Sequence, residues 1–211
     1  CSWIDRPVGT VDSGTNVTPA CSVYNYGDTT AANYTVRMRI GSTYNETALV
    51  SGHAQGTSVY VTFPNWLASG RGRFSVSCST ELADPRPANN RRLDSVMVAV
   101  HDLGAVAIVA PGSAVPPGPL TPRATVRNYG TGREPALVYF AISPLGYRDS
   151  LYLPSGLPFA DTTVSFASWN AVPGSYAARC STGLGSDQNR TNDTVSRPFT
   201  VNSVDVGVLR I

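Results

Sequence analysis

Four cysteines and two histidines are the residues of this 211-residue chain that most readily bind transition metals, and a cysteine thiolate is also a nucleophile. The cysteines stand singly along the chain, without the Cys-x-x-Cys pairs of common zinc and redox sites. Such single cysteines favour disulfides formed in an oxidising compartment, so we expect a secreted, extracellular or cell-surface protein. The sequence predicts no cofactor and no metal site.

His101 and Asp102 are adjacent and form the most suggestive catalytic pair. The same place one repeat later is held by Val204 and Asp205, so we interpret the pair as polar linker residues rather than as a catalytic dyad. His53 lies in a Ser-Gly-His-Ala-Gln-Gly turn and is expected to be solvated. The aspartates lack the Asp-x-Asp-x-Asp-Gly spacing of a calcium loop. The sequence therefore predicts that the protein is not an enzyme.

Composition indicates an all-β protein. The 19 Gly and 16 Pro residues separate short runs rich in Val, Tyr and Thr, and Leu, Glu and Lys are too scarce for ordinary helices. The chain has no lysine, and its net charge of +2 is spread without clusters, which argues against binding nucleic acid or an anionic membrane. No apolar run approaches the roughly 20 residues that a membrane span needs.

Five Asn-X-Ser/Thr sequons are candidate glycosylation sites of a secreted protein. Strands rich in Thr and Asn also generate such triplets by chance, and this alternative stays open. The sequons begin at Asn16, Asn33, Asn45, Asn189 and Asn192.

An internal repeat organises the chain. Residues 18–27 recur 103 residues later as residues 121–130, and both segments contain a Thr-Pro start and an Asn-Tyr-Gly end. Trp66 and Trp169 occupy equivalent places, so we interpret both as core residues. A repeat of this length has the size of one β-sandwich domain and not of a short solenoid repeat.

Within each repeat, short runs alternate apolar and polar residues and are separated by turn residues, as strands of a sandwich require. The fold class predicted is all-β, with two tandem immunoglobulin-like β-sandwiches in residues 1–100 and 101–202 and a C-terminal donor strand in residues 203–211. In the first repeat the expected strands cover residues 16–26, 33–40, 44–50, 58–63, 73–80 and 93–100.

Residues 121–130 carry the pattern Thr-Pro-x-Ala-x-Val-x-Asn-Tyr-Gly, and residues 18–27 share it except for Cys21 at the alanine position. This strand resembles the opening strand of the CARDB-like and related immunoglobulin-like modules of bacterial and archaeal surface proteins. The resemblance covers nearly the whole chain. It implies a sandwich fold, and it leaves function open because such modules serve as spacers, adhesin parts and filament subunits.

The end of the chain repeats the first strand of the second domain. Residues 203–211 follow residues 100–108 at the same spacing of 103, after the last strand of the second domain. The corresponding strand of the first domain, residues 1–6, is short and poorly apolar, with Trp3 and Ile4 at the expected acceptor edge. The apolar residues of the expected donor strand are Val204, Val206, Val208, Leu209 and Ile211.

These features predict donor-strand exchange, in which the tail of one subunit completes the first domain of the next. A head-to-tail contact of this kind propagates into an open filament. The tail resembles the inserted peptides of pilus-like filaments, which implies a structural or adhesive role, self-association and a surface or glycan target. The alternative is a spacer or ligand-binding module excised from a larger secreted adhesin or hydrolase, with the tail as the first strand of a third domain.

The cysteines are expected to pair within the sandwich. Cys21 and Cys78 lie on the inward faces of strands from opposite sheets, so their disulfide is the first choice among three connectivities. In the second repeat, the position equivalent to Cys21 is occupied by Ala124, so Cys180 has no partner equivalent to that of Cys78. Two alternatives remain for Cys180, a bridge to Cys1 of a neighbouring subunit or burial as a thiol.

Overall fold

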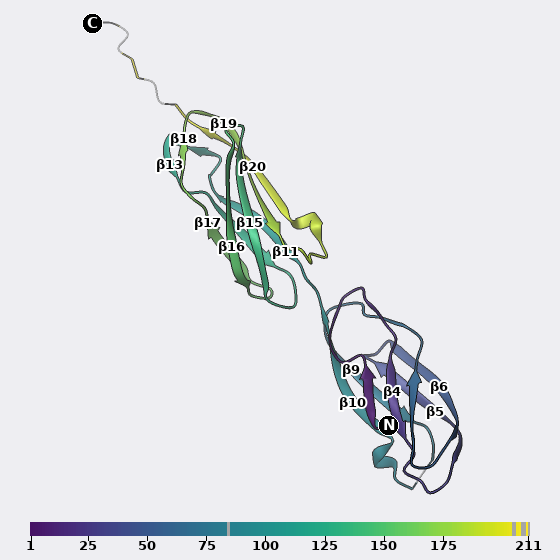
Figure 1. The fold of residues 1–211 in the computed structure, drawn as a ribbon. Helices are drawn as coiled ribbons and strands as arrows, with labels where there is room; N and C mark the ends of the chain where they lie inside the picture. The colour runs from purple at the N-terminus through teal and green to yellow at the C-terminus, as the bar shows by residue number, and fades with distance from the viewer. Residues whose placement is uncertain (84, 204–205, 208–209, 211) are drawn as a thin grey trace. The chain divides into compact units, whose positions relative to one another are not determined.

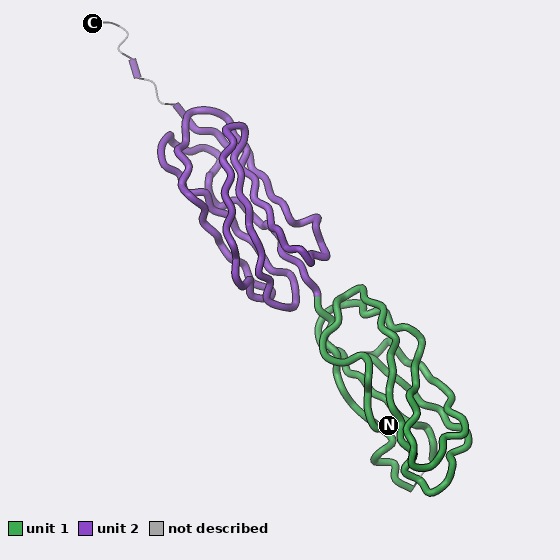
Figure 2. Tube along the Cα trace, in the orientation of Figure 1, with its two compact units in different colours: residues 1–99 green, residues 100–211 purple. Residues whose placement is uncertain are grey.

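The protein is described by a computed structural model for residues 1–83, 85–203, 206–207 and 210, and it consists almost entirely of β-strands (Figure 1). It divides into two compact units, Cys1–Ala99 and Val100–Ile211 (Figure 2). Each unit is an immunoglobulin-like β-sandwich, which confirms the predicted fold class of the two repeats. No helix in the described part of the chain is long and apolar enough to cross a membrane.

Unit 1 packs a three-stranded sheet, ordered β1-β4-β7, against a five-stranded sheet, ordered β2-β10-β9-β5-β6, with a small β3-β8 pair beside them. All neighbours are antiparallel except β2 and β10. The elements are β1 (Trp3–Arg6), β2 (Gly9–Asp12), β3 (Asn16–Val17), β4 (Ala20–Tyr24), β5 (Ala31–Ile40), β6 (Tyr44–His53), β7 (Ser58–Thr62), β8 (Trp66–Leu67), β9 (Gly72–Thr80), the 3-10 helix η1 (Pro87–Asn89) and β10 (Arg91–Ala99).

Unit 2 repeats this topology, with sheets ordered β11-β14-β17 and β12-β20-β19-β15-β16 and a β13-β18 pair. The one parallel pairing, β12 with β20, is again between the second strand and the last. The elements are β11 (Leu103–Ala110), β12 (Ala114–Val115), β13 (Gly118–Leu120), β14 (Arg123–Asn128), β15 (Glu134–Ser143), β16 (Tyr147–Gly156), β17 (Asp161–Ser165), β18 (Trp169–Ala171), β19 (Gly174–Gly183), η2 (Arg190–Asn192) and β20 (Thr194–Val201).

The first strand of unit 1 is shorter than that of unit 2, with four residues in β1 and eight in β11. It nevertheless takes the same place, because β1 pairs with β4 as β11 pairs with β14. Ile4 lies opposite Cys21 and is buried in the core of unit 1. The edge of β4 is thus occupied in cis by β1, and β1 itself is the outer strand of its sheet.

The core of each unit is formed by alternate residues of both sheets. Trp66 and Trp169 are buried at equivalent positions, which confirms their interpretation as core residues. The predicted strand over residues 16–26 is divided into β3 and β4, because Pro19 has no backbone N–H to continue the ladder. Strand β2 was not expected from the sequence, because its four residues Gly-Thr-Val-Asp are too few to show an alternation of apolar and polar side chains.

Candidate functional site

The segment that precedes β11, residues 100–103, is bound at one end of unit 2 through its backbone. The peptide N–H groups of Tyr129 and Gly130 both donate to Asp102 O, at 2.9 and 3.2 Å. These two residues form the turn that follows β14, so the turn presents its N–H groups to a carbonyl of the incoming segment. The carbonyl of Asp102 thereby satisfies two backbone N–H groups that would otherwise have no hydrogen-bond acceptor within the sandwich.

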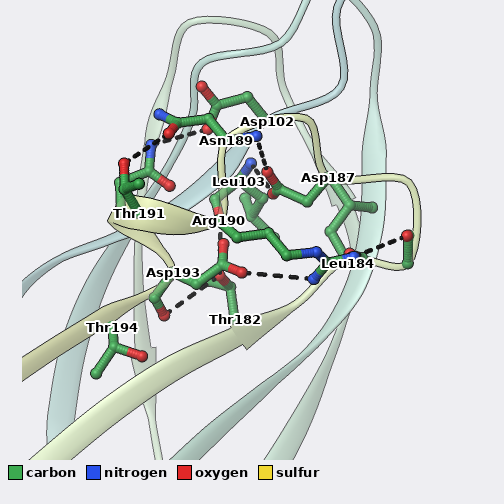
Figure 3. A network of polar contacts seen from close by, with 12 residues as sticks. Asp102, Leu103, Thr182, Leu184, Asp187, Asn189, Arg190, Thr191, Asp193 and Thr194 are labelled. Carbon is green, nitrogen blue, oxygen red and sulfur yellow. Dashed lines mark hydrogen bonds and ion pairs between the residues drawn. The ribbon is translucent and has the colours of Figure 1, made fainter.

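Side chains from the far side of the sandwich complete the binding of this segment, as Figure 3 shows. Asn192 Nδ2 donates to Asp102 Oδ1 at 2.8 Å. Leu103 N donates to Asp187 Oδ2 at 2.9 Å, and Thr182 Oγ1 donates to Leu103 O at 2.6 Å. The side chain of Leu103 is fully buried, so polar contacts hold the backbone while an apolar anchor enters the core.

His101 belongs to the same segment but not to a catalytic dyad with Asp102. Its Nδ1 lies 2.7 Å from Oε1 of Glu134, a buried carboxylate at the start of β15. Its backbone exchanges two hydrogen bonds with Gln188, at 2.9 and 3.2 Å. Asp102 instead accepts from Asn192, so each side chain has a partner of its own and both act in positioning the segment.

Two glycines make room for the bound segment. A Cβ on Gly130 would lie 2.6 Å from Val100 O, and a Cβ on Gly104 would lie 2.8 Å from Asn192 Cγ and 3.0 Å from the ring of Tyr129. Such distances are far inside van der Waals contact, so both positions exclude a side chain. Each residue of the Asp-Leu-Gly sequence 102–104 therefore has a structural reason: Asp102 accepts from Asn192, Leu103 is buried, and Gly104 has no room for a side chain.

Unit 1 contains the same turn at its equivalent end. Asn25 Nδ2 donates to the carbonyl oxygens of Thr29 and His53, both at 2.9 Å, and Gly27 N donates to Asn25 Oδ1 at 2.9 Å. Asn128 makes the same three kinds of bond in unit 2. The Asn-Tyr-Gly sequence thus builds one turn twice, since the Asn side chain closes it through these hydrogen bonds.

Beside this turn of unit 1 lies a cavity of about 490 Å³. Thr80 and Asn89 line it and correspond, by the repeat, to Thr182 and Asn192, two of the side chains that bind residues 100–103 in unit 2. The lining also includes Cys1, Asn25, Tyr26, Gly27 and Ala31. The receptor groups of unit 2 therefore have counterparts in unit 1, and they surround open space.

The two ends differ in the residues that contact His101 in unit 2. Ala31 stands in the place of Glu134, because each is the first residue of its strand and each follows the Asn-Tyr-Gly turn at the same distance. Pro85 stands in the place of Gln188, because Arg86 and Asn189 precede η1 and η2 at equivalent positions. The cavity of unit 1 is thus fitted to a segment without the imidazole of unit 2.

His53 is not solvated, contrary to the sequence expectation. Its side chain is 2% exposed, its Nδ1 lies 2.6 Å from Tyr34 Oη, and its Nε2 lies 2.9 Å from Thr57 O. A carbonyl only accepts, so Nε2 carries the proton and Nδ1 accepts from the tyrosine. Burial raises the pKa of Tyr34, which keeps this donor protonated. The turn around His53 folds inward because these two bonds satisfy the imidazole.

The cysteines of unit 1 gather at one place. Cys21 in β4 and Cys78 in β9 are fully buried with their Sγ atoms 2.8 Å apart, and the Sγ of Cys1 completes a group whose members all lie within 4.8 Å of one another. This is the one group of His, Cys, Asp and Glu side chains in the described residues that has the spacing of a metal site, and thiolates suit soft metals. The Cys21–Cys78 disulfide stays a prediction.

Cys180 is fully buried in the core of unit 2, where burial raises the pKa of its thiol to about 12. This burial suits the alternative of a buried thiol. The bridge between Cys180 and Cys1 of a neighbouring subunit stays a prediction.

The other predicted site residues fall in different surroundings. Trp3 is 57% exposed, with the guanidinium of Arg92 over its ring, and Val206 is 90% exposed. Val204, Val208, Leu209 and Ile211 lie outside the described residues. Four sequon asparagines are exposed, namely Asn16, Asn33, Asn45 and Asn189. Asn192 is a poor glycan acceptor, because its amide nitrogen is the donor to Asp102.

No protein-family model and no curated protein matches the chain. Among solved structures, it is similar to the CARDB domain of a Pyrococcus furiosus protein in complex with two metal ions, at 15% identity and a TM-score of 0.37 over 49% of this chain and 87% of the other. Fibronectin type III-like modules of Clostridium thermocellum CbhA match over 94% of this chain and 92% of theirs, at 18% identity and a TM-score of 0.29.

A tandem repeat from the extending region of a large adhesion protein matches at 14% identity and a TM-score of 0.34, over 89% of this chain and half of the other. Red sea bream transglutaminase matches at 14% identity and a TM-score of 0.39 over 94% of this chain, which spans 30% of that enzyme. At these identities and TM-scores the similarities carry no inference about function.

Proposed function

We propose that the chain is a structural subunit of an extracellular, pilus-like filament, in which residues 203–211 of one copy bind in the cavity of unit 1 of the next copy. The observation that carries the proposal is the contrast between two equivalent ends. Residues 100–103 occupy the end of unit 2, and a cavity of about 490 Å³ lies at the end of unit 1.

The tail has the sequence of the segment that fills unit 2. Residues 203–208 correspond to residues 100–105, so Asp205, Val206 and Gly207 stand for Asp102, Leu103 and Gly104. The tail thus keeps the carboxylate, the apolar anchor and the glycine whose roles are set by the surroundings in unit 2. A segment with this pattern fits a cavity that offers the same receptor groups.

The receptor groups assign a partner to each part of the tail. By analogy with unit 2, the N–H groups of Tyr26 and Gly27 donate to the carbonyl of Asp205, and the side chain of Asn89 donates to its carboxylate. Thr80 donates to the carbonyl of Val206, as Thr182 does to that of Leu103. The apolar side chain then enters beside the end of β1, which extends the role of the expected acceptor edge at Trp3.

One pair of differences makes the tail specific for unit 1. His101 pairs with Glu134 in unit 2, and the tail carries Val204 where the cavity of unit 1 carries Ala31. The polar pair of His101 and Glu134 is thus replaced by the apolar pair of Val204 and Ala31, with one change in the segment and one in the receptor. The tail would leave Glu134 without its partner in unit 2, so the complementarity favours docking on unit 1.

A contact between the C-terminal tail of one copy and the opposite unit of another is heterologous, and it repeats head to tail. Strand addition of this kind combines main-chain hydrogen bonds with a pocket for an apolar side chain. The partner is therefore a second copy of the same chain, and the product is a filament whose exposed faces remain available for a surface or glycan target.

A double-mutant cycle tests the Val204 and Ala31 pair. Ala31→Glu places an unpartnered carboxylate in the cavity and should weaken assembly by several kcal/mol, a loss of about tenfold to a thousandfold. Val204→His in the same chain should restore assembly by recreating the pair of unit 2. Sedimentation velocity and negative-stain microscopy measure assembly, and Thr30→Glu, on an exposed neighbouring residue outside the cavity, is the matched control.

Gly207→Val gives a second, independent test. A Cβ on Gly207 meets nothing in its own chain, so both units should fold and melt as in the original protein. In the docked tail the same Cβ would strike the equivalents of Asn192 and Tyr129, so filaments should be lost. Filaments that form unchanged with Gly207→Val would refute the tail contact, and a chain that stays monomeric in every form would favour a spacer or ligand-binding module of a larger adhesin or hydrolase.

A further inference from the structure

Three sulfur atoms share one site in unit 1. The Sγ atoms of Cys1, Cys21 and Cys78 all lie within 4.8 Å of one another, and the last two are 2.8 Å apart. A disulfide joins two sulfurs, so a bond between any two of them leaves the third within reach of it. Three thiols at such spacing can exchange a disulfide among themselves with little movement of the backbone.

The three sulfurs differ in their access to solvent. Cys21 and Cys78 are fully buried between the two sheets of unit 1. Cys1 is half-buried and lines the cavity of about 490 Å³ beside them. A dissolved thiol or disulfide therefore meets Cys1 first, and it reaches the buried pair only after unit 1 opens or after Cys1 reacts.

We propose that Cys1 is a relay thiol, through which the buried Cys21–Cys78 disulfide exchanges with thiols and disulfides in solution. The inference rests on the predicted disulfide and is independent of the filament. Cys1 Sγ lies 3.9 Å from the carbonyl oxygen of Ser22, which follows Cys21, and the pairing of β1 with β4 keeps it there. Cys21 is accordingly the sulfur that Cys1 attacks.

The exchange balances without any further oxidant. The thiolate of Cys1 attacks Cys21 Sγ, a Cys1–Cys21 bond forms, and the bond to Cys78 breaks with Cys78 leaving as a thiolate that takes up the proton lost by Cys1. An external thiolate then attacks Cys1 Sγ, and Cys21 leaves as a thiol after protonation. The mixed disulfide on Cys1 is released by a second thiol of the reductant, and oxidation by a dissolved disulfide follows the same steps in reverse.

Direct reaction of Cys21 and Cys78 with dissolved thiols and disulfides is expected to be slow. In the reduced protein, the hydrogen bond from Cys78 and burial both raise the pKa of Cys21, so the thiolate that could attack a dissolved disulfide is scarce. In the oxidised protein, burial of both sulfurs hinders direct attack by a dissolved thiol on their bond. A sulfur that stands at the cavity and touches the pair removes the need to open the sandwich.

Reduction of the oxidised, full-length protein by dithiothreitol in native buffer tests the relay. Alkylation and peptide mass mapping follow the loss of the Cys21–Cys78 bond with time. Cys1→Ser should slow this loss about tenfold or more, and Cys180→Ser, in the core of unit 2, should leave it unchanged. In denaturant the Cys1→Ser and unmodified proteins should react at equal rates, because the pair is then exposed.

A trapping variant tests the intermediate without relying on rates. Cys78→Ser, treated with oxidised glutathione, should accumulate a Cys1–Cys21 disulfide in place of two glutathione adducts. The relay is wrong if Cys1→Ser is reduced as fast as the unmodified protein in native buffer, or if Cys78→Ser carries only adducts. It is equally wrong if the three cysteines of the unmodified protein carry a metal ion and no disulfide.

Discussion

The two equivalent ends of the sandwiches are built alike and filled differently. In unit 2, residues 100–103 enter the turn at Tyr129 and Gly130 and bring Leu103 into the core. In unit 1 the turn at Tyr26 and Gly27 faces a cavity. The segment that fills unit 2 is the backbone that enters its first strand, β11. Comparing the two units shows which groups of unit 1 could bind a segment, because the equivalent groups of unit 2 already do so.

A second contrast concerns the cores. Unit 1 places Cys21 against Cys78 between its sheets, whereas unit 2 has Ala124 and Cys180 at the corresponding positions and contains a cluster of aromatic rings elsewhere in its core. Trp169, Tyr176 and Phe199 form mutual ring contacts with centroids 5.1 to 6.0 Å apart. The same sandwich is therefore stabilised by a sulfur pair in one unit and by aromatic packing in the other.

The largest effect is expected from the apolar anchor of the filled end. Leu103→Ala removes a fully buried side chain from unit 2 and should destabilise that unit by about 2–5 kcal/mol. Unit 1 should be unaffected. Calorimetry that resolves two transitions would check this, and a loss shared equally by both transitions would contradict the separate filling of the two ends.

Chemical reduction should lower the stability of unit 1 and leave that of unit 2 unchanged, which is the reverse of the effect of Leu103→Ala. Excess dithiothreitol should destabilise unit 1 by about 2–4 kcal/mol through loss of the Cys21–Cys78 bond. Unit 2 contains one cysteine, Cys180, and should melt as before. Thermal melts with and without reductant, with a Cys180→Ser variant as control, measure the difference; an unchanged first unit would mean that no disulfide forms.

Equivalent glycine substitutions sharpen the comparison at the turn itself. Gly130→Ala should cost unit 2 about 1–3 kcal/mol, because its Cβ would lie 2.6 Å from Val100 O. Gly27→Ala meets only its own turn, at 3.1 Å from Asn25 Oδ1, and should change the stability of unit 1 much less. Urea unfolding of both variants checks this. If the tail docks on unit 1, Gly27→Ala should still impair assembly.

The smallest effect is a pH dependence confined to unit 2. Burial and the nearby charge of Asp187 raise the pKa of Asp193, so the folded unit binds more protons than the unfolded one just above the ordinary aspartate range. The stability of unit 2 should therefore decline as the pH rises through that range. Asp193→Asn should flatten this decline in melts between about pH 4 and pH 6, and an identical slope in both proteins would rule out this contribution.

The sequence predicted most of the architecture because alternation and turn residues act locally. The strands around Tyr34, Phe74 and Val96, the burial of Trp66 and Trp169, and the repeat itself were all readable from spacing. His53 shows the limit, because a Gly-rich turn indicates exposure and only the approach of Tyr34 from a neighbouring strand buries the imidazole. Glu134, which binds His101, carried no sequence signal of its own.

The sequence by itself determined that two sandwiches are built from one repeat and that residues 203–208 match the segment that enters the second of them. Tertiary structure alone decided that Ile4 fills the first strand position, that Cys1 lies beside Cys21 and Cys78, and that Thr80 and Asn89 face a cavity. The physical reason is range. Alternation and turn chemistry act between neighbours in the chain, whereas occupancy depends on groups brought together from strands far apart in sequence.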